Sequence, residues 1–277
     1  MSKEVINISE THKNFIRKYG GLIFIITILI VFVILAIFNF NFGQWLADSI
    51  MWFYRNYGDI GIYIGVFVIS IFGNFTIIFP VPYVIALIVI SAIISTVNPI
   101  MLGLFGALGA SIGEVSAWLI GRGSQKIIGD SENIERMKKY IDLGWAPLII
   151  FIFAATPLPD DAFLIVLGIA KYSIIKTLIF TFIGKFVLCF LCSALPIWFA
   201  DTTFGNFLFN LFGINLEAAR TGIIPPSTPI DILWSSLVWS ATIIIMFLLV
   251  YVDWGSILMR LKKRNELNNS SKEIQNK

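Results

Sequence analysis

Hydrophobic residues along this chain come in long runs that are separated by short polar segments. The runs cover Leu22–Phe38, Ile60–Ile94, Met101–Ile120, Ala146–Lys171, Ile174–Ala200 and Ile232–Val252. A helix that crosses the hydrocarbon core of a bilayer needs about 17 to 25 mainly apolar residues. Because every run reaches this length or exceeds it, the pattern predicts an all-α polytopic membrane protein.

Paired prolines interrupt two of these runs. Pro80 and Pro82 break the run from Ile60, and Pro157 and Pro159 break the run from Ala146. A broken helix at membrane depth is tolerated only where protein or a watery cavity surrounds its free backbone groups. We therefore expect each broken run to form a re-entrant helical hairpin with the prolines at its turn, and we expect the two turns to meet inside the protein.

Each predicted hairpin is followed by a full span in which a charge comes directly after a glycine. The first span carries Gly113-Glu114 and the second carries Gly184-Lys185. The two hairpins enter from opposite sides, so this weak internal similarity is typical of an inverted-repeat transporter. The predicted fold is an inverted repeat of hairpin plus span with flanking transmembrane helices.

Glycines also mark one face of the first of these two spans. Gly103, Gly106, Gly109 and Gly113 recur at three- and four-residue spacing. Small residues at this spacing allow another helix to approach closely. The stripe therefore predicts a helix contact rather than a site with its own chemistry.

Basic residues determine the predicted orientation, because Lys and Arg concentrate in cytoplasmic segments. Seventeen of the 20 Lys and Arg residues lie in the N-tail, in segment 122–139, in the C-tail or just after the second proline break. All seventeen lie on one side of the membrane if each broken run enters and leaves the membrane on the same side. The pattern thus predicts a multi-pass protein of the cell membrane with both termini in the cytoplasm. It leaves open whether each hairpin dips halfway or crosses twice.

These elements give a predicted organisation in five parts. The segment Trp45–Tyr57 alternates aromatic and polar residues, which is typical of a helix lying in the membrane interface. The parts are a cytoplasmic N-tail (1–21), a first transmembrane helix with the interfacial helix (22–59), a membrane domain (60–200), an outer loop with the last transmembrane helix (201–254) and a basic cytoplasmic tail (255–277).

The composition excludes other classes of protein. Apolar residues make up 57% of the chain and charged residues only 13%, against about 45–50% and about 25% in soluble domains. A soluble enzyme and a disordered chain are therefore excluded. Cys189 and Cys192 lie in an apolar run and are interpreted as small hydrophobic residues. Without a nucleophile–base pair, a phosphate loop or zinc spacing, we predict no enzyme activity, no cofactor, no metal and no nucleic-acid partner.

Ionisable residues at membrane depth are the candidates for function, since each costs about 2.5–3.5 kcal/mol to insert. We expect Asp160, Asp161 and Glu114 to form a proton or cation relay, and Lys185 and Arg122 to contact the headgroup of a substrate. Adjacent carboxylates repel each other, which favours proton exchange at the second break. The alternative is a structural Glu114–Lys185 pair with interfacial aspartates.

The segment Gly113–Arg122 carries a resemblance to a known family. It has a glycine, an acid, an aromatic residue four positions on (Trp118) and then Gly121-Arg122. This pattern resembles the DedA family, also called the SNARE-associated Golgi protein or VTT-domain family, over about residues 60–200. The resemblance implies two opposed re-entrant hairpins and the movement of lipid between leaflets. Bacterial members of that family recycle polyprenyl phosphate carriers, some with proton coupling, and eukaryotic relatives scramble phospholipids.

This chain departs from the family pattern at its second hairpin. Ala154 and Asp160 stand where bacterial members typically carry arginines around the proline, and Asn74 stands where an acid usually precedes the first break. Arginine is suited to bidentate phosphate binding, so Lys185 and Arg122 remain as the cationic candidates.

The function expected from these observations is the movement of a lipid or a lipid-linked phosphate between leaflets, with proton coupling as a further possibility. The partners are then membrane lipids, with polyprenyl phosphate or a phospholipid as candidates, and a homo-oligomer is left open. The alternatives are a proton- or cation-coupled transporter of a small solute and a non-transporting membrane assembly factor.

Overall fold

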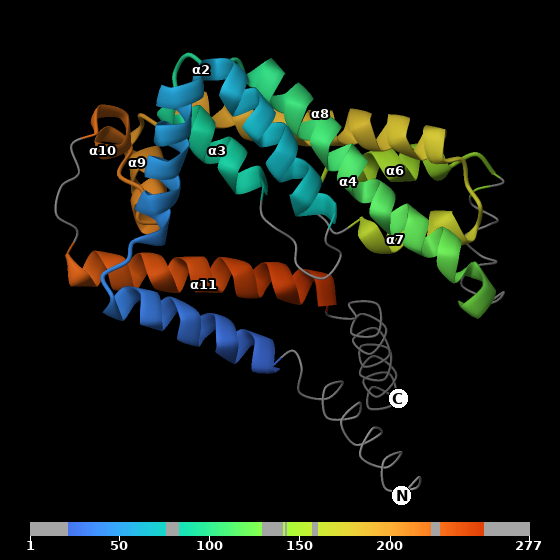
Figure 1. Cartoon of the computed structure of the whole chain (residues 1–277), viewed down its shortest axis with the longest axis horizontal. Coiled ribbons are helices and arrows are strands. Elements are labelled where there is room, and N and C mark those ends of the chain that lie inside the picture. Colours follow the sequence, from blue (N-terminus) through green and yellow to red (C-terminus); the bar gives the residue numbers. More distant parts are fainter. Residues whose placement is uncertain are drawn as a thin grey trace, which may run out of the picture. The chain divides into compact units, whose positions relative to one another are not determined.

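The computed structural model describes residues 22–75, 83–128, 141, 143–156, 160–222 and 228–251, and every regular element among them is a helix (Figure 1). The chain divides into two compact units, of which Leu29–Ala241 is one and Met1–Ile28 with Thr242–Lys277 is the other. The candidate site lies in Leu29–Ala241, and the packing described below is that of this unit.

The prediction of an all-α fold is confirmed for the described residues. The helices are Leu22–Ile37, α2 (Phe42–Phe75), α3 (Tyr83–Ile93), α4 (Pro99–Ile128), α6 (Ala146–Ala154), α7 (Asp161–Ile169), α8 (Ile174–Phe199), α9 (Thr203–Leu211), α10 (Leu216–Thr221) and α11 (Pro229–Tyr251).

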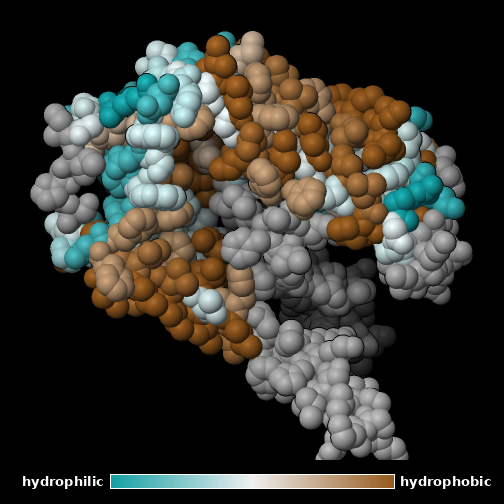
Figure 2. Space-filling model, in the orientation of Figure 1, coloured by the Kyte–Doolittle hydropathy of each residue, from teal (hydrophilic) through white to brown (hydrophobic). Residues whose placement is uncertain are grey.

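Three helices of the described part are long and apolar enough to cross a membrane: Phe42–Phe75, Pro99–Ser124 and Ile174–Phe199. The first of the last two contains the predicted span 101–120, and the second covers the predicted span 174–200 up to Phe199. Large apolar side chains are exposed along these helices, among them Phe72, Ile112 and Ile183, and Figure 2 shows hydrophobic atoms over the middle stretches of the visible helices. Such surfaces are stable against lipid rather than water, as expected for a multi-pass membrane protein.

The predicted interfacial helix and the start of the first broken run form the two helical segments of α2, which meet at a kink. The kink lies at Gly58, where the backbone has φ 64° and ψ −164°. Glycine tolerates this conformation because it lacks a Cβ atom. The two predicted pieces are therefore both helical, and a bend joins them rather than a loop.

The described part of the predicted outer loop and last transmembrane helix (201–254) contains two short helices, α9 and α10, ahead of α11. The Thr202 side chain accepts a hydrogen bond from the Gly205 N–H, and the Asn215 side chain accepts one from the Ala218 N–H. These are N-cap interactions, which start short helices. Arg220 of α10 also donates to the Ala92 carbonyl at the end of α3 and pairs with Asp201.

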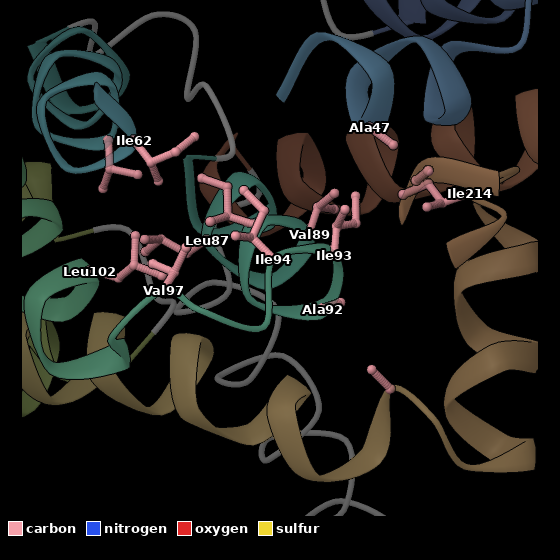
Figure 3. Packing of buried hydrophobic residues seen from close by; sticks show 14 of the residues in the cluster. Ala47, Ile62, Leu87, Val89, Ala92, Ile93, Ile94, Val97, Leu102 and Ile214 are labelled. Atoms are coloured by element: carbon pink, nitrogen blue, oxygen red, sulfur yellow. The ribbon is translucent and has the colours of Figure 1, made fainter. Parts of the chain in front are cut away.

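The helix α3 lies in the centre of the hydrophobic core. Leu87, Val89 and Ile93 are buried and pack with Ile62 of α2 and Leu102 of α4 (Figure 3). A helix that is hydrophobic on all sides is stable only when it is buried on all sides. Its position explains why the run after the first proline break shows no polar face.

The helices next to the two proline breaks pack in a reciprocal pattern around α4 and α8, which contact each other. Helix α2 precedes the first break and packs on α4, whereas α3 follows that break and packs on α8. Helix α6 precedes the second break and packs on α8, whereas α7 follows it and packs on α4. In each half, the helix before the break contacts the next long helix in the chain, and the helix after it contacts the long helix of the other half.

Glycines make these contacts possible. A Cβ atom at Gly113 of α4 would lie 2.5 Å from the Ile71 carbonyl oxygen of α2, and one at Gly184 of α8 would lie 2.7 Å from the Phe151 carbonyl oxygen of α6. Both distances are shorter than atomic contact allows. The glycine stripe of α4 thus does predict close packing, and it divides between α2, which faces Gly109 and Gly113, and α8, which faces Gly103 and Gly106.

The predicted hairpin turns Pro80, Pro82, Pro157 and Pro159 lie outside the described residues, as do the N-tail 1–21 and the tail 255–277. The helices on both sides of each break are described, so the residues that they bring together can be placed.

Candidate functional site

Three charged side chains meet between α4, α7 and α8. The Lys185 Nζ atom lies 2.6 Å from Glu114 Oε1 and 3.0 Å from Asp160 Oδ2. The side chains are 5%, 2% and 9% exposed, respectively, so the ion pairs form away from the surface. We call Glu114, Asp160 and Lys185 the buried charge cluster.

The position of each member follows from the local sequence. Glu114 comes directly after Gly113, and Lys185 comes directly after Gly184. The glycines bring α4 and α8 against the helices that precede the breaks, and the charges then face the space between the halves. Asp160 is the N-cap residue of α7 but its side chain makes no capping hydrogen bond, so its carboxylate is available to Lys185.

The structure brings together three of the five charged residues that the sequence singled out. Asp161 follows Asp160 as a half-buried residue at the start of α7 and forms neither ion pair of the cluster. Arg122 is exposed and lies eight positions beyond Glu114 on α4, which is about 12 Å along a helix at 1.5 Å per residue. Arg122 therefore does not share a site with Lys185 in this structure.

Tyr83 is a fourth residue of this region that the sequence reasoning missed. It is 7% exposed, and it lies close enough to Lys185, Glu114 and Asp160 to interact electrostatically with all three. Tyr83 directly follows the first Pro-x-Pro break, just as Asp160 directly follows the second. This equivalence between the two breaks is the signal that could have identified it.

The cluster contains two acidic groups but only one basic group. When all three groups are ionised, two carboxylates face one ammonium group, and the cluster carries an excess negative charge. An uncompensated buried charge costs several kcal/mol. The arrangement therefore favours the uptake of one proton or one cation. Among the described residues, no group of three or more His, Cys, Asp or Glu side chains is arranged to hold a metal ion.

A small cavity adjoins the cluster on one side. Its volume is about 10 Å³, which is close to the space that one water molecule needs. Among the described residues, the Thr181 hydroxyl and the Glu114 Oε2 atom have no hydrogen-bond partner. The lining residues are Ser111, Glu114, Val115, Leu164, Ile174, Thr177, Leu178 and Thr181.

Comparison with known proteins gives one match. The family model of the VTT domain matches residues 79–195. The match covers α3, α4, α6 and α7 and most of α8, so it includes the whole buried charge cluster and Tyr83. No curated protein and no solved structure matches the chain.

Proposed function

Since residues 79–195 are a VTT domain, the domain of the DedA/SNARE-associated Golgi protein family, we propose that this membrane protein transports a lipid or a lipid-linked phosphate between the two leaflets. The observation that carries the proposal is the buried charge cluster, in which Glu114, Asp160 and Lys185 meet between the two halves of the domain. Buried ionisable groups in membrane proteins commonly mark the path of a substrate or an ion.

The proposed architecture is the inverted repeat of two re-entrant hairpins, each followed by a transmembrane helix. The reciprocal packing of α2, α3, α6 and α7 on α4 and α8 supports it. So does the equivalence of Glu114 with Lys185 and of Tyr83 with Asp160, because each pair occupies the same place in its half. Transporters of this kind bind their substrates near the interface of the repeats.

The cluster offers a physical reason for proton coupling. A phosphate headgroup that approaches Lys185 competes with Glu114 and Asp160 for the same ammonium group. When the phosphate takes Lys185, a carboxylate loses its partner, and a proton taken up by that carboxylate removes the unpaired charge. Release of the headgroup then returns the proton. Asp161, next to Asp160, is the proposed relay to the cluster.

The proposed roles of the cations differ with their burial. Lys185 is buried and is the proposed contact for the headgroup charge, whereas Arg122 is exposed in the C-terminal part of α4. An exposed arginine attracts anionic headgroups at the membrane surface. We place both termini in the cytoplasm of a cell-membrane protein, because this orientation puts the clustered Lys and Arg residues on the cytoplasmic side.

The test is a reconstitution in liposomes that contain a trace of fluorescent lipid. One series carries a labelled phospholipid and a second carries a labelled polyprenyl phosphate, and a membrane-impermeant quencher is added outside. We expect quenching of well over half the signal in at least one series, since inner-leaflet lipid then reaches the outer face. Asp160→Asn with Asp161→Asn should reduce the rate of this movement or its dependence on pH.

Two other outcomes would overturn the proposal. If quenching stops at the outer leaflet in both series and a water-soluble tracer is transported, the protein is a small-solute transporter. If no probe moves, and cells that carry a variant with every cluster charge neutralised grow normally, a non-transporting assembly factor is the better account.

A further inference from the structure

The cavity beside Glu114 lies on one side of the buried charge cluster. It is lined by Thr177 and Thr181 of α8, which precede Lys185 by two turns and by one turn. The two threonines are 5% and 1% exposed. A line of polar side chains at four-residue spacing therefore leads along α8 to Lys185 inside a helix that is otherwise strongly apolar.

The polar side chains of this line lie between Lys185 and the N-terminal end of α8. Helices α4 and α8 run antiparallel, since Gly103 approaches Phe190, Glu114 pairs with Lys185 and the Trp118 indole N–H donates to the Tyr172 carbonyl. The cavity thus lies between the cluster and the membrane face at which α8 begins. Ile174, the first residue of α8, is among the residues that line it.

The hydroxyl groups along the cavity differ in their bonding. The Thr177 hydroxyl donates to the Ser173 carbonyl at 3.0 Å, and the Ser111 hydroxyl donates to the Ala107 carbonyl at 2.7 Å. Each keeps lone pairs that can accept a further hydrogen bond. The Thr181 hydroxyl has no partner among the described residues, and neither has Glu114 Oε2. A buried polar atom without a partner is costly unless water supplies one.

We propose that this cavity is a one-sided proton entry route that holds a water molecule between the Thr181 hydroxyl and the Glu114 carboxylate. A proton leaves the Glu114 carboxyl for this water, which passes one of its own protons on past Thr177 towards the face at which α8 begins. Protonation of Glu114 follows the same path in reverse. The inference rests on the proposed function, in which the cluster exchanges protons during transport, and adds the side from which they come.

Ser193 of α8 is a matched control for Thr177 and Thr181, because it lies on the same helix face but on the other side of Lys185. Ser193 lies two turns beyond Lys185, is completely buried, and donates its hydroxyl to the Cys189 carbonyl at 2.8 Å. Its hydroxyl is therefore satisfied within the helix, and Ser193 is not among the residues that line the cavity. Ile183 is 42% exposed on the apolar outer surface and provides a second comparison.

The experiment measures the reaction of introduced cysteines with Ag⁺, a membrane-impermeant, thiol-reactive ion small enough for a cavity the size of one water molecule. The full chain with Cys189→Ala and Cys192→Ala is reconstituted, and Thr177→Cys, Thr181→Cys, Ser193→Cys and Ile183→Cys are compared. We expect Thr177→Cys and Thr181→Cys to react several-fold faster than Ser193→Cys and Ile183→Cys, and only from the face at which α8 begins. Equal rates for all four variants, or reaction from the opposite face, would overturn the route.

A second pair of variants tests the hydroxyl itself. Thr181→Val removes the hydroxyl and keeps the shape of the side chain, whereas Thr181→Ser keeps the hydroxyl. The rate at which a pH dye trapped in proteoliposomes responds to an external acid pulse should fall several-fold for Thr181→Val and stay near the parent value for Thr181→Ser. An unchanged rate for Thr181→Val would contradict a role of this hydroxyl.

The cysteine measurement does not require lipid to move, whereas the proton flux is measured with the lipid that the quenching experiment identifies. If cysteine labelling shows the expected pattern and no lipid crosses the bilayer, the entry route stands and the proposed substrate class fails. If lipid crosses but Thr181→Cys stays unlabelled, the proposed function stands and the entry route fails.

Discussion

Lys185 forms ion pairs with both Glu114 and Asp160. The stability of the cluster therefore depends more on Lys185 than on either acid. An ammonium group between two carboxylates tolerates the loss of either acid better than the acids tolerate the loss of the ammonium group. After removal of Asp160, the Glu114–Lys185 pair at 2.6 Å remains balanced. After removal of Lys185, two buried carboxylates face each other without a counter-ion.

A comparison of Lys185→Met with Asp160→Asn tests this dependence. We expect Lys185→Met to destabilise the protein by about 3–5 kcal/mol, the cost of breaking a buried ion pair from one side. Asp160→Asn should cost about 1–2 kcal/mol, because an amide still accepts a hydrogen bond from Lys185. Thermal unfolding in detergent measures both, with Glu217→Gln, at an exposed position of α10, as the control. Equal losses for Lys185→Met and Asp160→Asn would mean that charge balance does not stabilise the cluster.

The sequence alone identified Glu114, Lys185 and Asp160, because isolated charges in apolar runs stand out. It could not show that Arg122 lies apart from them. The exposure of a residue near a helix end depends on where the neighbouring helices stop, and this is a property of the tertiary structure. Tyr83 escaped notice for another reason, since a tyrosine at the start of an apolar helix is common in membrane proteins and signals no chemistry on its own.

Among the secondary-structure elements, glycine-mediated contacts hold the helices that carry the site. Helices α4 and α7 approach so closely that a Cβ atom at Gly121 would overlap the Ile165 carbonyl group. Gly123 lies two residues further along α4, and a Cβ atom there would meet nothing within 4 Å. The two glycines of one helix thus face different environments.

We expect Gly121→Ala to lower the free energy of unfolding by about 1–3 kcal/mol, since the added methyl group must push α7 away from α4. Gly123→Ala should leave stability unchanged or raise it by about 0.5–1 kcal/mol, because alanine favours the helix. The measurement is the midpoint of thermal or denaturant unfolding in detergent. If both variants are equally stable, the close approach of α7 to α4 is not present in the protein.

The pattern of apolar runs predicted the long helices but not the short helices between them. Residues 101–120 and 174–199 are helical because uninterrupted apolar sequence leaves the backbone no other way to satisfy its hydrogen bonds in lipid. The segment after Ala200 was predicted as a loop because its helices are short. The N-cap residues Thr202 and Asn215 were the available signals, and short capped helices are stabilised mainly by packing that a sequence does not show.

For the molecule as a whole, the reciprocal packing around α4 and α8 connects the two proline breaks. The sequence predicted an inverted repeat from two weak similarities, the Pro-x-Pro breaks and the Gly-charge pairs that follow them, but it did not predict this packing. Neither similarity could show that the charges of the two halves pair directly. That pairing depends on the tertiary contact of α4 with α8, which Gly103 and Gly106 allow by bringing α4 close to Phe190 and Cys189.

The proposed orientation can be tested with fusions of a reporter that is active on one side of the membrane only. Fusions at both termini and within segment 122–139 should report the cytoplasm, and a fusion within segment 223–227 should report the outside. Replacing the Lys and Arg residues of the N-tail by Gln should weaken this preference, because positive charge fixes the orientation. Opposite locations for the two termini would contradict the proposed topology.

The central claim is that the buried charge cluster couples protons to the movement of a lipid. Its most direct test is proton uptake by proteoliposomes with a trapped pH dye, measured with and without the lipid that the quenching experiment identifies. The account predicts a proton flux that depends on this lipid in the parent protein, is lost in Glu114→Gln and is unchanged in Glu217→Gln. Lipid movement without a proton flux, or an undiminished flux in Glu114→Gln, would contradict it.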